Sequence, residues 1–197
     1  MFGAKQALAF GVRRGFGAKR VELVGAPARG LGRLTSVLRV AVLLPTTFQH
    51  GGEFLADVAA LETAGAYAEL IEGSDPVSLV VLGALAAATH RVQVGCVMGE
   101  ALSAEACAAL DRISGGRAMV FARGEPPERL TVQGVEPAEA WVQIAMPGDR
   151  MAWRETLAAQ AAAGVAGLIV QWDPRLIDLL RNPDADDDRS DLQMSTG

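Results

Sequence analysis

The stretch from Ser74 to Arg117 constrains the fold of this chain more than any other part. Asp75-Pro76 marks a helix start, because an Asp side chain caps free backbone N–H groups and Pro suits the first helical turn. The helix that follows is apolar on most of its faces, which is typical of a buried helix. Residues 92–98 then predict a strand covered on both faces, and a second helix runs from Ser103 to Ser114-Gly115-Gly116. Strand, helix and strand in this order indicate parallel strands joined by a crossover helix.

The same alternation extends through the rest of the chain. The predicted strands are residues 38–45, 67–72, 92–98, 117–122, 130–132, 141–145 and 166–171, and the predicted helices are residues 54–64, 76–88, 103–114, 151–163 and 173–181. The connection between 130–132 and 141–145 is too short for a crossover helix. We therefore expect these two strands to pair antiparallel or to lie at an edge.

A complete (β/α)₈ barrel does not fit into the 197 residues of this chain. Such barrels typically need about 250 residues. Residues 39–181 hold about five βα units at roughly 30 residues a unit. We therefore predict an α/β fold, specifically a truncated or incomplete TIM-barrel-like parallel βα domain with open sheet edges. Open edges demand cover, so we expect a homo-oligomer or docking on a larger protein complex.

Charge divides the chain into three parts. Residues 1–37 form a basic, Gly-rich N-terminal arm, residues 38–181 the α/β domain, and residues 182–197 an acidic C-terminal tail. Up to Arg39 there are eight Lys or Arg against Glu22 alone. The arm is either a disordered extension or a segment that folds on an anionic protein, lipid or phosphate surface. Nucleic acid is disfavoured as its partner, since no aromatic stacking platform or recognition helix accompanies the charge.

The two cysteines, Cys96 and Cys107, exclude a disulfide framework and indicate a cytoplasmic protein. Their spacing is not that of a zinc site, so no metal is expected. No run of about 18 uncharged apolar residues predicts a membrane span. The basic arm nevertheless suits an anionic membrane surface, which would make the protein peripheral at the inner face of the membrane.

Several segments of the chain together resemble one known family. They are Asp75-Pro76, the Ala-rich helix end Ala86 to Arg91, the Gly-containing strand Val92 to Val97, and the turn Leu110 to Arg117. This combination is similar to the bacterial luciferase-like flavin monooxygenase family, which includes deazaflavin-dependent oxidoreductases. With a further match in GVAGLIVQWDPRLIDLLRNPD, the resemblance covers roughly residues 39–191.

The resemblance implies a luciferase-like barrel, FMN or deazaflavin as cofactor, and oxidoreductase activity. It places the strand of Gly95 and Cys96 against the flavin ring, where a Gly allows close backbone approach. Another reading stays open, in which both are ordinary core residues. The chain also departs from the family, because Glu72-Gly73-Ser74 stands where many members have an acidic-His pair, and the phosphate-binding segments are largely missing.

Ligands of such barrels bind at the carboxyl-terminal ends of the strands. The positions to inspect are Pro45 to His50, Glu72 to Ser74, Cys96 to Gly99 and Ala122 to Gly124. His50 is the candidate catalytic residue, as a general base, although a lone His beside two glycines is also typical of a solvated loop. Arg117 is expected to make a structural hydrogen bond or salt bridge at its turn.

Two functions remain open on the sequence. In the first, the chain is a non-catalytic luciferase-like accessory subunit, docked through its arm on a larger assembly such as a membrane-associated redox complex. In the second, it is a flavin- or deazaflavin-dependent oxidoreductase or monooxygenase. The missing strands, the absent histidine and the lost phosphate segments favour the accessory subunit.

Overall fold

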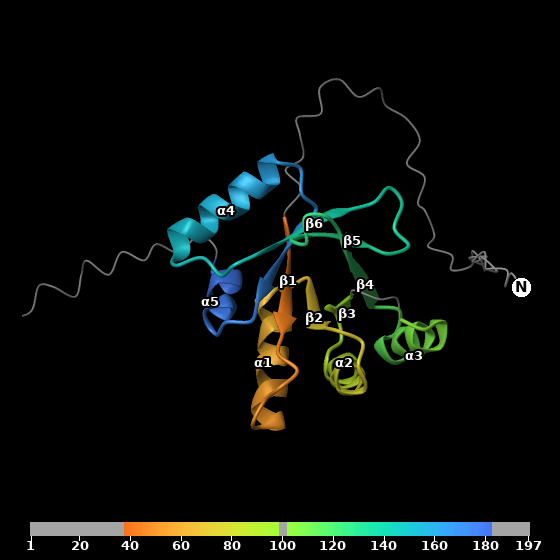
Figure 1. The fold of residues 1–197 in the computed structure, drawn as a ribbon. Coiled ribbons are helices and arrows are strands. Elements are labelled where there is room, and N and C mark those ends of the chain that lie inside the picture. Colours follow the sequence, from red (N-terminus) through yellow and green to blue (C-terminus); the bar gives the residue numbers. More distant parts are fainter. Residues whose placement is uncertain (1–37, 99–101, 183–197) are drawn as a thin grey trace, which may run out of the picture. The chain divides into compact units, whose positions relative to one another are not determined.

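The computed structural model describes residues 38–98 and 102–182 of the chain (Figure 1). The basic arm predicted for residues 1–37 and all but the first residue of the predicted acidic tail lie outside these ranges. Within the described part, no helix is long and apolar enough to cross a membrane.

Strands and helices alternate along the first half of the described chain, as the sequence predicts. The strands are β1 (Arg39–Leu44), β2 (Ala68–Glu72), β3 (Gln93–Met98), β4 (Ala118–Arg123), β5 (Arg129–Val132), β6 (Ala140–Ile144) and β7 (Gly167–Gln171). The helices are α1 (Gly51–Ala64), α2 (Pro76–Ala88), α3 (Ala104–Ser114), α4 (Arg150–Ala162) and α5 (Arg175–Arg181). The largest difference from the predicted bounds is at α1, which includes the two glycines expected in the preceding loop. Phe54 of its first turn stacks on Phe48, with ring centroids 4.4 Å apart, and this packing outweighs the poor helix propensity of glycine.

The strands form a closed barrel in the order β1-β2-β3-β4-β5-β6-β7. β7 pairs with β1, so that Ala41 of β1 lies between Ala68 of β2 and Ile169 of β7. β5 runs antiparallel to both β4 and β6, and every other neighbouring pair is parallel. The α/β class and the antiparallel pairing of the two short strands are thus confirmed.

The prediction of an incomplete barrel with open sheet edges is wrong. It assumed that each further strand needs a crossover helix, which takes a dozen or more residues. The chain instead turns back after β4 through residues 124–128 and again after β5 through residues 133–139. The antiparallel strand β5 closes the barrel with few residues, so none of the strands in residues 38–98 and 102–182 has an edge that needs a partner. Because barrels carry many unrelated functions, the luciferase-like identity stays a prediction.

Side chains fill the interior of the barrel. Residues that alternate along the strands point inward and pack around Trp141, which is 0% exposed and meets Phe121 edge to face at 5.2 Å between ring centroids. The Trp141 ring takes the space of a side chain at Gly167, where a Cβ would lie 2.3 Å from it. The barrel interior is therefore a packed core rather than a channel.

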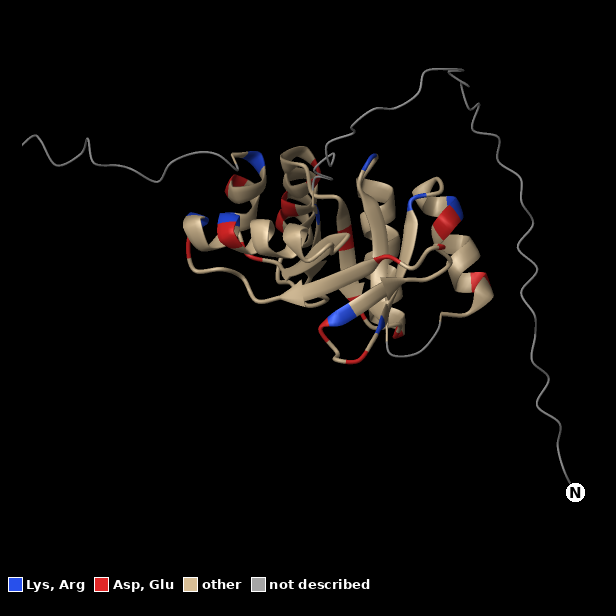
Figure 2. Ribbon diagram, turned by 90° about the horizontal axis from the view of Figure 1, so that it is seen from above, with Lys and Arg blue, Asp and Glu red and all other residues tan. Residues whose placement is uncertain are grey.

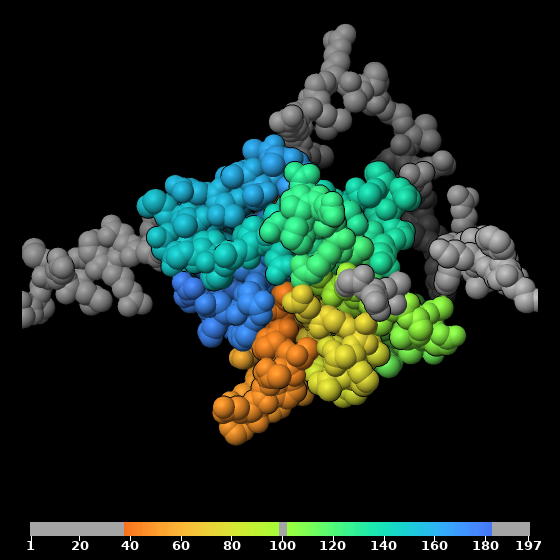
Figure 3. All heavy atoms as spheres, in the orientation of Figure 1, coloured from red at the N-terminus to blue at the C-terminus, as the bar shows by residue number. Residues whose placement is uncertain are grey.

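A second core lies between the outer face of the strands and the helices. It contains Val42 and Leu44 of β1, Cys96 of β3 and Trp153 of α4, among other buried side chains. In the shared view of Figures 1 and 3, α5 appears directly below α4. Arg150 of α4 joins them, because its guanidinium pairs with the carboxylate of Asp178 and donates to the carbonyl of Asn182.

The sequence predicts that the uncharged helix α2 is buried, but one face of it is open. Val77 and Val80 are 60% and 74% exposed, whereas Val81, Leu82 and Leu85 pack on the barrel. Most of the strand wall is uncharged too, and charged residues lie mainly on helices and loops (Figure 2). α2 therefore presents an apolar, charge-free strip to its surroundings.

Candidate functional site

Three inward-pointing polar residues meet at the carboxyl-terminal mouth of the barrel. Glu72 and Arg123 are the last residues of β2 and β4, and Gln143 is the second last residue of β6. Each comes two residues after a buried side chain of the interior core, which are Leu70, Phe121 and Trp141. Because side chains alternate along a strand, the three polar residues point to the same side as those core residues.

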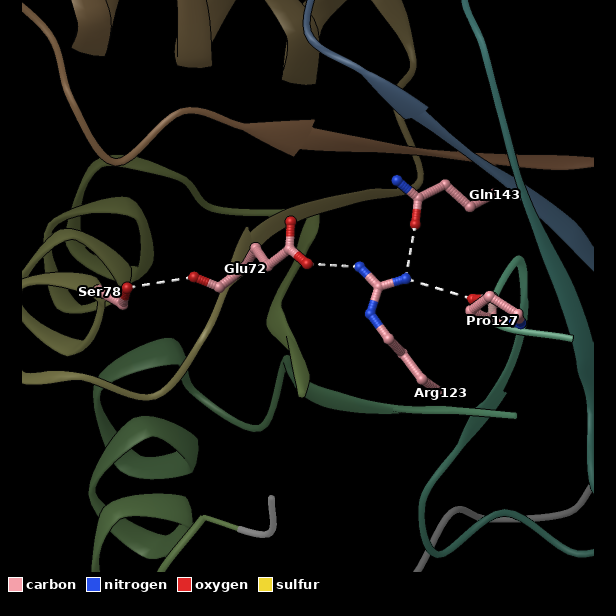
Figure 4. Close-up of polar contacts among 5 residues, drawn as sticks. All are labelled: Glu72, Ser78, Arg123, Pro127 and Gln143. Carbon is pink, nitrogen blue, oxygen red and sulfur yellow. Dashed lines mark hydrogen bonds and ion pairs between the residues drawn. The ribbon is translucent and has the colours of Figure 1, made fainter. Parts of the chain in front are cut away.

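Arg123 connects the other two residues across the mouth (Figure 4). Its Nη2 lies 2.5 Å from Oε1 of Glu72, and its Nη1 donates to Oε1 of Gln143 at 3.0 Å. The same Nη1 donates to the carbonyl of Pro127 at 3.2 Å. One guanidinium thereby ties β2, β4, β6 and the β4–β5 turn together over the packed interior.

The turn from β2 into α2 is held by its own polar contacts. The carboxylate of Asp75 accepts hydrogen bonds from the backbone N–H groups of Val77 and Ser78, and the Ser78 hydroxyl lies within hydrogen-bond distance of both the Asp75 carboxylate and the Glu72 carbonyl. The hydrogen bond from the Ser78 hydroxyl, with those from the backbone, lowers the pKa of Asp75. Gly73 completes the turn with a φ of +95°, a conformation that favours glycine. The position of Glu72 is thus set by its neighbours in sequence.

The chemistry open to this mouth is that of an ion pair. A guanidinium stays protonated and only donates hydrogen bonds, so Arg123 can hold an anionic group but cannot exchange protons. Its charge is already matched by Glu72, and the Glu72 side chain is 60% exposed. In the described residues there is no cluster of three His, Cys, Asp or Glu side chains that could hold a metal ion.

The structure does not bring the three predicted site residues together. His50 is exposed at the start of α1, where its backbone carbonyl accepts from the Phe54 N–H at 3.1 Å and its side chain makes no capping bond. Gly95 faces the interior side of the wall, whereas Cys96 faces the helices and is 1% exposed. Burial, with a smaller contribution from Cys107, raises the pKa of the Cys96 thiol to about 12, so it stays protonated.

In the structure, the backbone that lies close to Gly95 is that of the neighbouring strand. A Cβ at this position would lie 2.0 Å from the carbonyl oxygen of Met119 on β4. Contact of Gly95 and Cys96 with a flavin stays a prediction. In the structure, both residues are packed within the protein, as the alternative interpretation expects.

Two of the three mouth residues lie in segments that the sequence marks for inspection. Glu72 and Arg123 each end a strand that precedes a glycine, and a charged residue at that place is a signal for a site. Gln143 was missed, because a short strand placed at an edge gave no reason to expect its side chain at the centre of the mouth. The sequence signal that places Gln143 is its position two residues after the apolar Trp141, because side chains two apart on a strand point to the same side.

Arg117 has the structural role that the sequence predicts. Its guanidinium donates to the carbonyls of Ala86, Thr89 and Val92 at 2.6 to 2.9 Å and to the Thr89 hydroxyl at 2.9 Å. These bonds satisfy carbonyls at the end of α2, which have no partner within the helix. The same corner is held from α1 by Glu62, whose Oε1 accepts from the N–H groups of residues 90, 91 and 92.

Comparison with known proteins assigns no family to this chain. No protein-family model and no curated protein matches it. A solved structure of prephenate dehydrogenase from A. aeolicus, in complex with hydroxyphenyl propionate and NAD+, is similar over 73% of this chain with 10% identity and a TM-score of 0.29. The chain spans 63% of the length of that protein. At this TM-score, the likeness carries no conclusion about the fold or the function, and the mouth of the barrel has to be interpreted from its own residues.

Proposed function

We propose that this protein is a non-catalytic accessory subunit that docks on a larger protein assembly through its basic arm, residues 1–37. A membrane-associated redox complex is one host whose anionic surface would attract the basic arm. The observation that carries this proposal is that the polar side chains at the barrel mouth are bonded within the protein. Glu72 and Gln143 each bond to Arg123 there, above an interior filled by Trp141 and Phe121.

A catalytic barrel holds its substrate and cofactor in a cavity at the carboxyl-terminal strand ends. Here the charges at the strand ends satisfy each other, the described residues hold no cluster of metal-ligating side chains, and burial raises the pKa of the Cys96 thiol to about 12. These features support a barrel that serves as a scaffold. Because the barrel is closed, the docking surface must be a helix face or the arm rather than a strand edge.

The outer face of α2 fits such docking. Val77 and Val80 are exposed, and α2 carries no charged residue from Pro76 to Ala88. Exposed apolar surface of this kind is a common mark of protein interaction sites. A partner helix or sheet that covers this face would bury it without leaving any charge unpaired.

A second candidate is the flavin- or deazaflavin-dependent oxidoreductase that the resemblance implies. The observation that favours it is the exposure of the Glu72 carboxylate at the strand ends, where barrel enzymes place their reactive groups. In that case Arg123 would release Glu72 and bind an anionic group of the cofactor or substrate instead.

One purification separates the two candidates. The full chain is isolated under native conditions from its source cell, beside a variant that lacks residues 1–37, and absorbance and mass spectra are recorded on the same samples. We expect a colourless full chain that co-purifies with a defined assembly and a deletion variant that loses it. A flavin or deazaflavin chromophore on a chain without a partner would favour the oxidoreductase.

A substitution pair tests the α2 face directly. Val80→Lys places a charge on the exposed strip of α2, and Ile113→Lys places one on α3, where Ile113 is 55% exposed. We expect the first to weaken co-purification strongly and the second to leave it unchanged. Equal effects of the two substitutions would contradict docking through α2.

A further inference from the structure

A groove of about 640 Å³ lies at the amino-terminal end of β1, at the opposite end of the barrel from Arg123. Its lining is mostly apolar. The apolar side chains include Leu38, Val40, Trp153, Leu157, Leu179 and Leu180. They come from β1 and the residue before it, α4 and α5, and Thr63 of α1 adds to the wall with Gly65 and Ala66, which follow α1.

The groove follows from the shortness of α5. This helix has seven residues, against 14 in α1 and 13 in α4. At a rise of 1.5 Å per residue, α5 is about 10 Å long and its neighbours are about 20 Å long. Because α5 is short and starts near the carboxyl-terminal end of the barrel, it leaves a hollow beside Leu38 and the buried Val40, which line it. Among the described residues, the groove is the space that two further turns of helix would fill.

Three charged residues line the groove, and two of them hold hydrogen bonds within the protein. Arg39 pairs with Glu139 at 2.6 Å, donates to the Tyr67 hydroxyl at 3.2 Å and stacks over the rings of Tyr67 and Trp141. Glu62 accepts three backbone N–H groups, as described above. The third, Arg91, is exposed, interacts electrostatically with Glu62, and forms no side-chain hydrogen bond with the residues that the structure describes. The groove therefore has one cation whose donors are open to a ligand.

We propose that this groove binds a small amphipathic carboxylate, with its apolar body against Trp153 and Leu157 and its carboxylate at Arg91. The volume lies within the ~300 to 1,000 Å³ typical of small-molecule sites, which are mostly apolar with a few well-placed polar groups. The planar fork of a guanidinium matches a carboxylate with two hydrogen bonds. This site lies apart from α2, so it adds a ligand to the proposed accessory role and does not depend on that role.

The test uses the full chain with two probes of equal length, decanoate and 1-decanol, measured by titration calorimetry at concentrations where both are monomeric. We expect saturable binding of one decanoate per chain, tighter than that of decanol. Arg91→Gln should weaken decanoate by about two- to fivefold, the range for an exposed ion pair, and leave decanol unchanged. Arg112→Gln on α3 is the matched control, because Arg112 does not line this groove.

Thr63→Trp tests the location of the site. Thr63 is an exposed residue of α1 at the groove wall, so the larger side chain fills the groove without entering the core. We expect it to abolish binding of both probes while the far-ultraviolet circular dichroism stays unchanged. The proposal is overturned if the full chain binds no decanoate, if Arg91→Gln and Arg112→Gln behave alike, or if Thr63→Trp binds normally. Binding to phosphatidylglycerol vesicles without binding of monomeric decanoate would also overturn it, because the ligand would then be a membrane lipid.

Discussion

The guanidinium of Arg123 and the carboxylate of Glu72 lie 2.5 Å apart, although β2 and β4 do not pair with each other. β3 runs between them, so the Arg123 side chain reaches over the end of β3 and inward across the mouth of the barrel. This contact places a permanent positive charge at the strand ends and neutralises it at the same time. The predictions that follow concern this mouth and the packing around it.

We expect the mouth ion pair to contribute little to stability. Arg123→Gln should lower the free energy of unfolding by no more than about 1 kcal/mol, because the Glu72 side chain is largely exposed and solvent screens the pair. Urea unfolding of Arg123→Gln, Glu72→Gln and the double variant measures the coupling energy. A coupling well above about 1 kcal/mol would show that the mouth excludes water more than its exposure indicates.

The pH dependence of stability should report the buried carboxyl of Glu69. This β2 residue is 0% exposed, and neither carboxylate oxygen has a hydrogen-bond partner in the described part of the chain. Burial and, to a smaller extent, the negative charge of Glu62 raise its pKa from 4.5 to about 8. The positive charge of Arg117 lowers this pKa but does not cancel the rise. The folded chain therefore holds a proton that the unfolded chain has lost between these two values. The free energy of unfolding should fall as pH rises from 4.5 to about 8, by at most about 1.4 kcal/mol per pH unit from this group.

The variant Glu69→Gln isolates this effect, because Gln has nearly the same shape and does not ionise. We expect it to flatten the fall in stability between these pH values and to stabilise the protein above about pH 8, in urea unfolding followed at several pH values. Glu155→Gln, at an exposed position of α4, is the control and should keep the fall. An unchanged slope in Glu69→Gln would mean that another group titrates.

Gly95 should not tolerate any side chain. A Cβ would lie 2.0 Å from the Met119 carbonyl oxygen, so Gly95→Ala must push β3 and β4 apart in the middle of the wall. We expect a loss of about 2 to 3 kcal/mol in the free energy of unfolding, at the upper end for overpacking. Gly83→Ala in α2 is the matched control, because its Cβ meets nothing within 4 Å and Ala favours the helix by about 0.5 to 1 kcal/mol. Thermal unfolding of both variants gives the comparison, and equal melting temperatures would contradict the close strand contact.

Arg117 should be worth more to stability than any exposed arginine. Its removal leaves the Thr89 hydroxyl, in a residue that is 1% exposed, and the carbonyls at the end of α2 without their donor. We expect Arg117→Ala to lower the free energy of unfolding by about 2 to 4 kcal/mol, since hydrogen bonds to a charged group are worth about 1.5 to 3 kcal/mol each and are not additive. Arg117→Lys should recover only part of this loss, because an ammonium lacks the planar fork. Arg112→Ala is the control on α3, and a similar loss there would contradict the role of Arg117.

The sequence by itself determined the elements of the described chain. The Asp75 and Ser103 caps, the glycine ends at Gly65 and Gly115, and the valine-rich strand of Cys96 are local signals, and the structure places helices and strands where they predict them. The short 133–139 connection likewise excluded a crossover helix, and of the two arrangements left open, an antiparallel pair or an edge position, the structure has the antiparallel pair. Such features depend on residues a few positions apart, so they can be read without knowing the fold.

Only the tertiary structure decided how the barrel closes and which residues meet. Pairing of β7 with β1 joins residues more than one hundred positions apart, and no local pattern indicates it. That closure removed the predicted open edges. It also brought Gln143 to Arg123, turned Gly95 inward and Cys96 outward, and buried Glu69 without a partner. Each of these outcomes depends on the direction and register of strands that are distant in sequence, which is why the candidate site was predicted only in part.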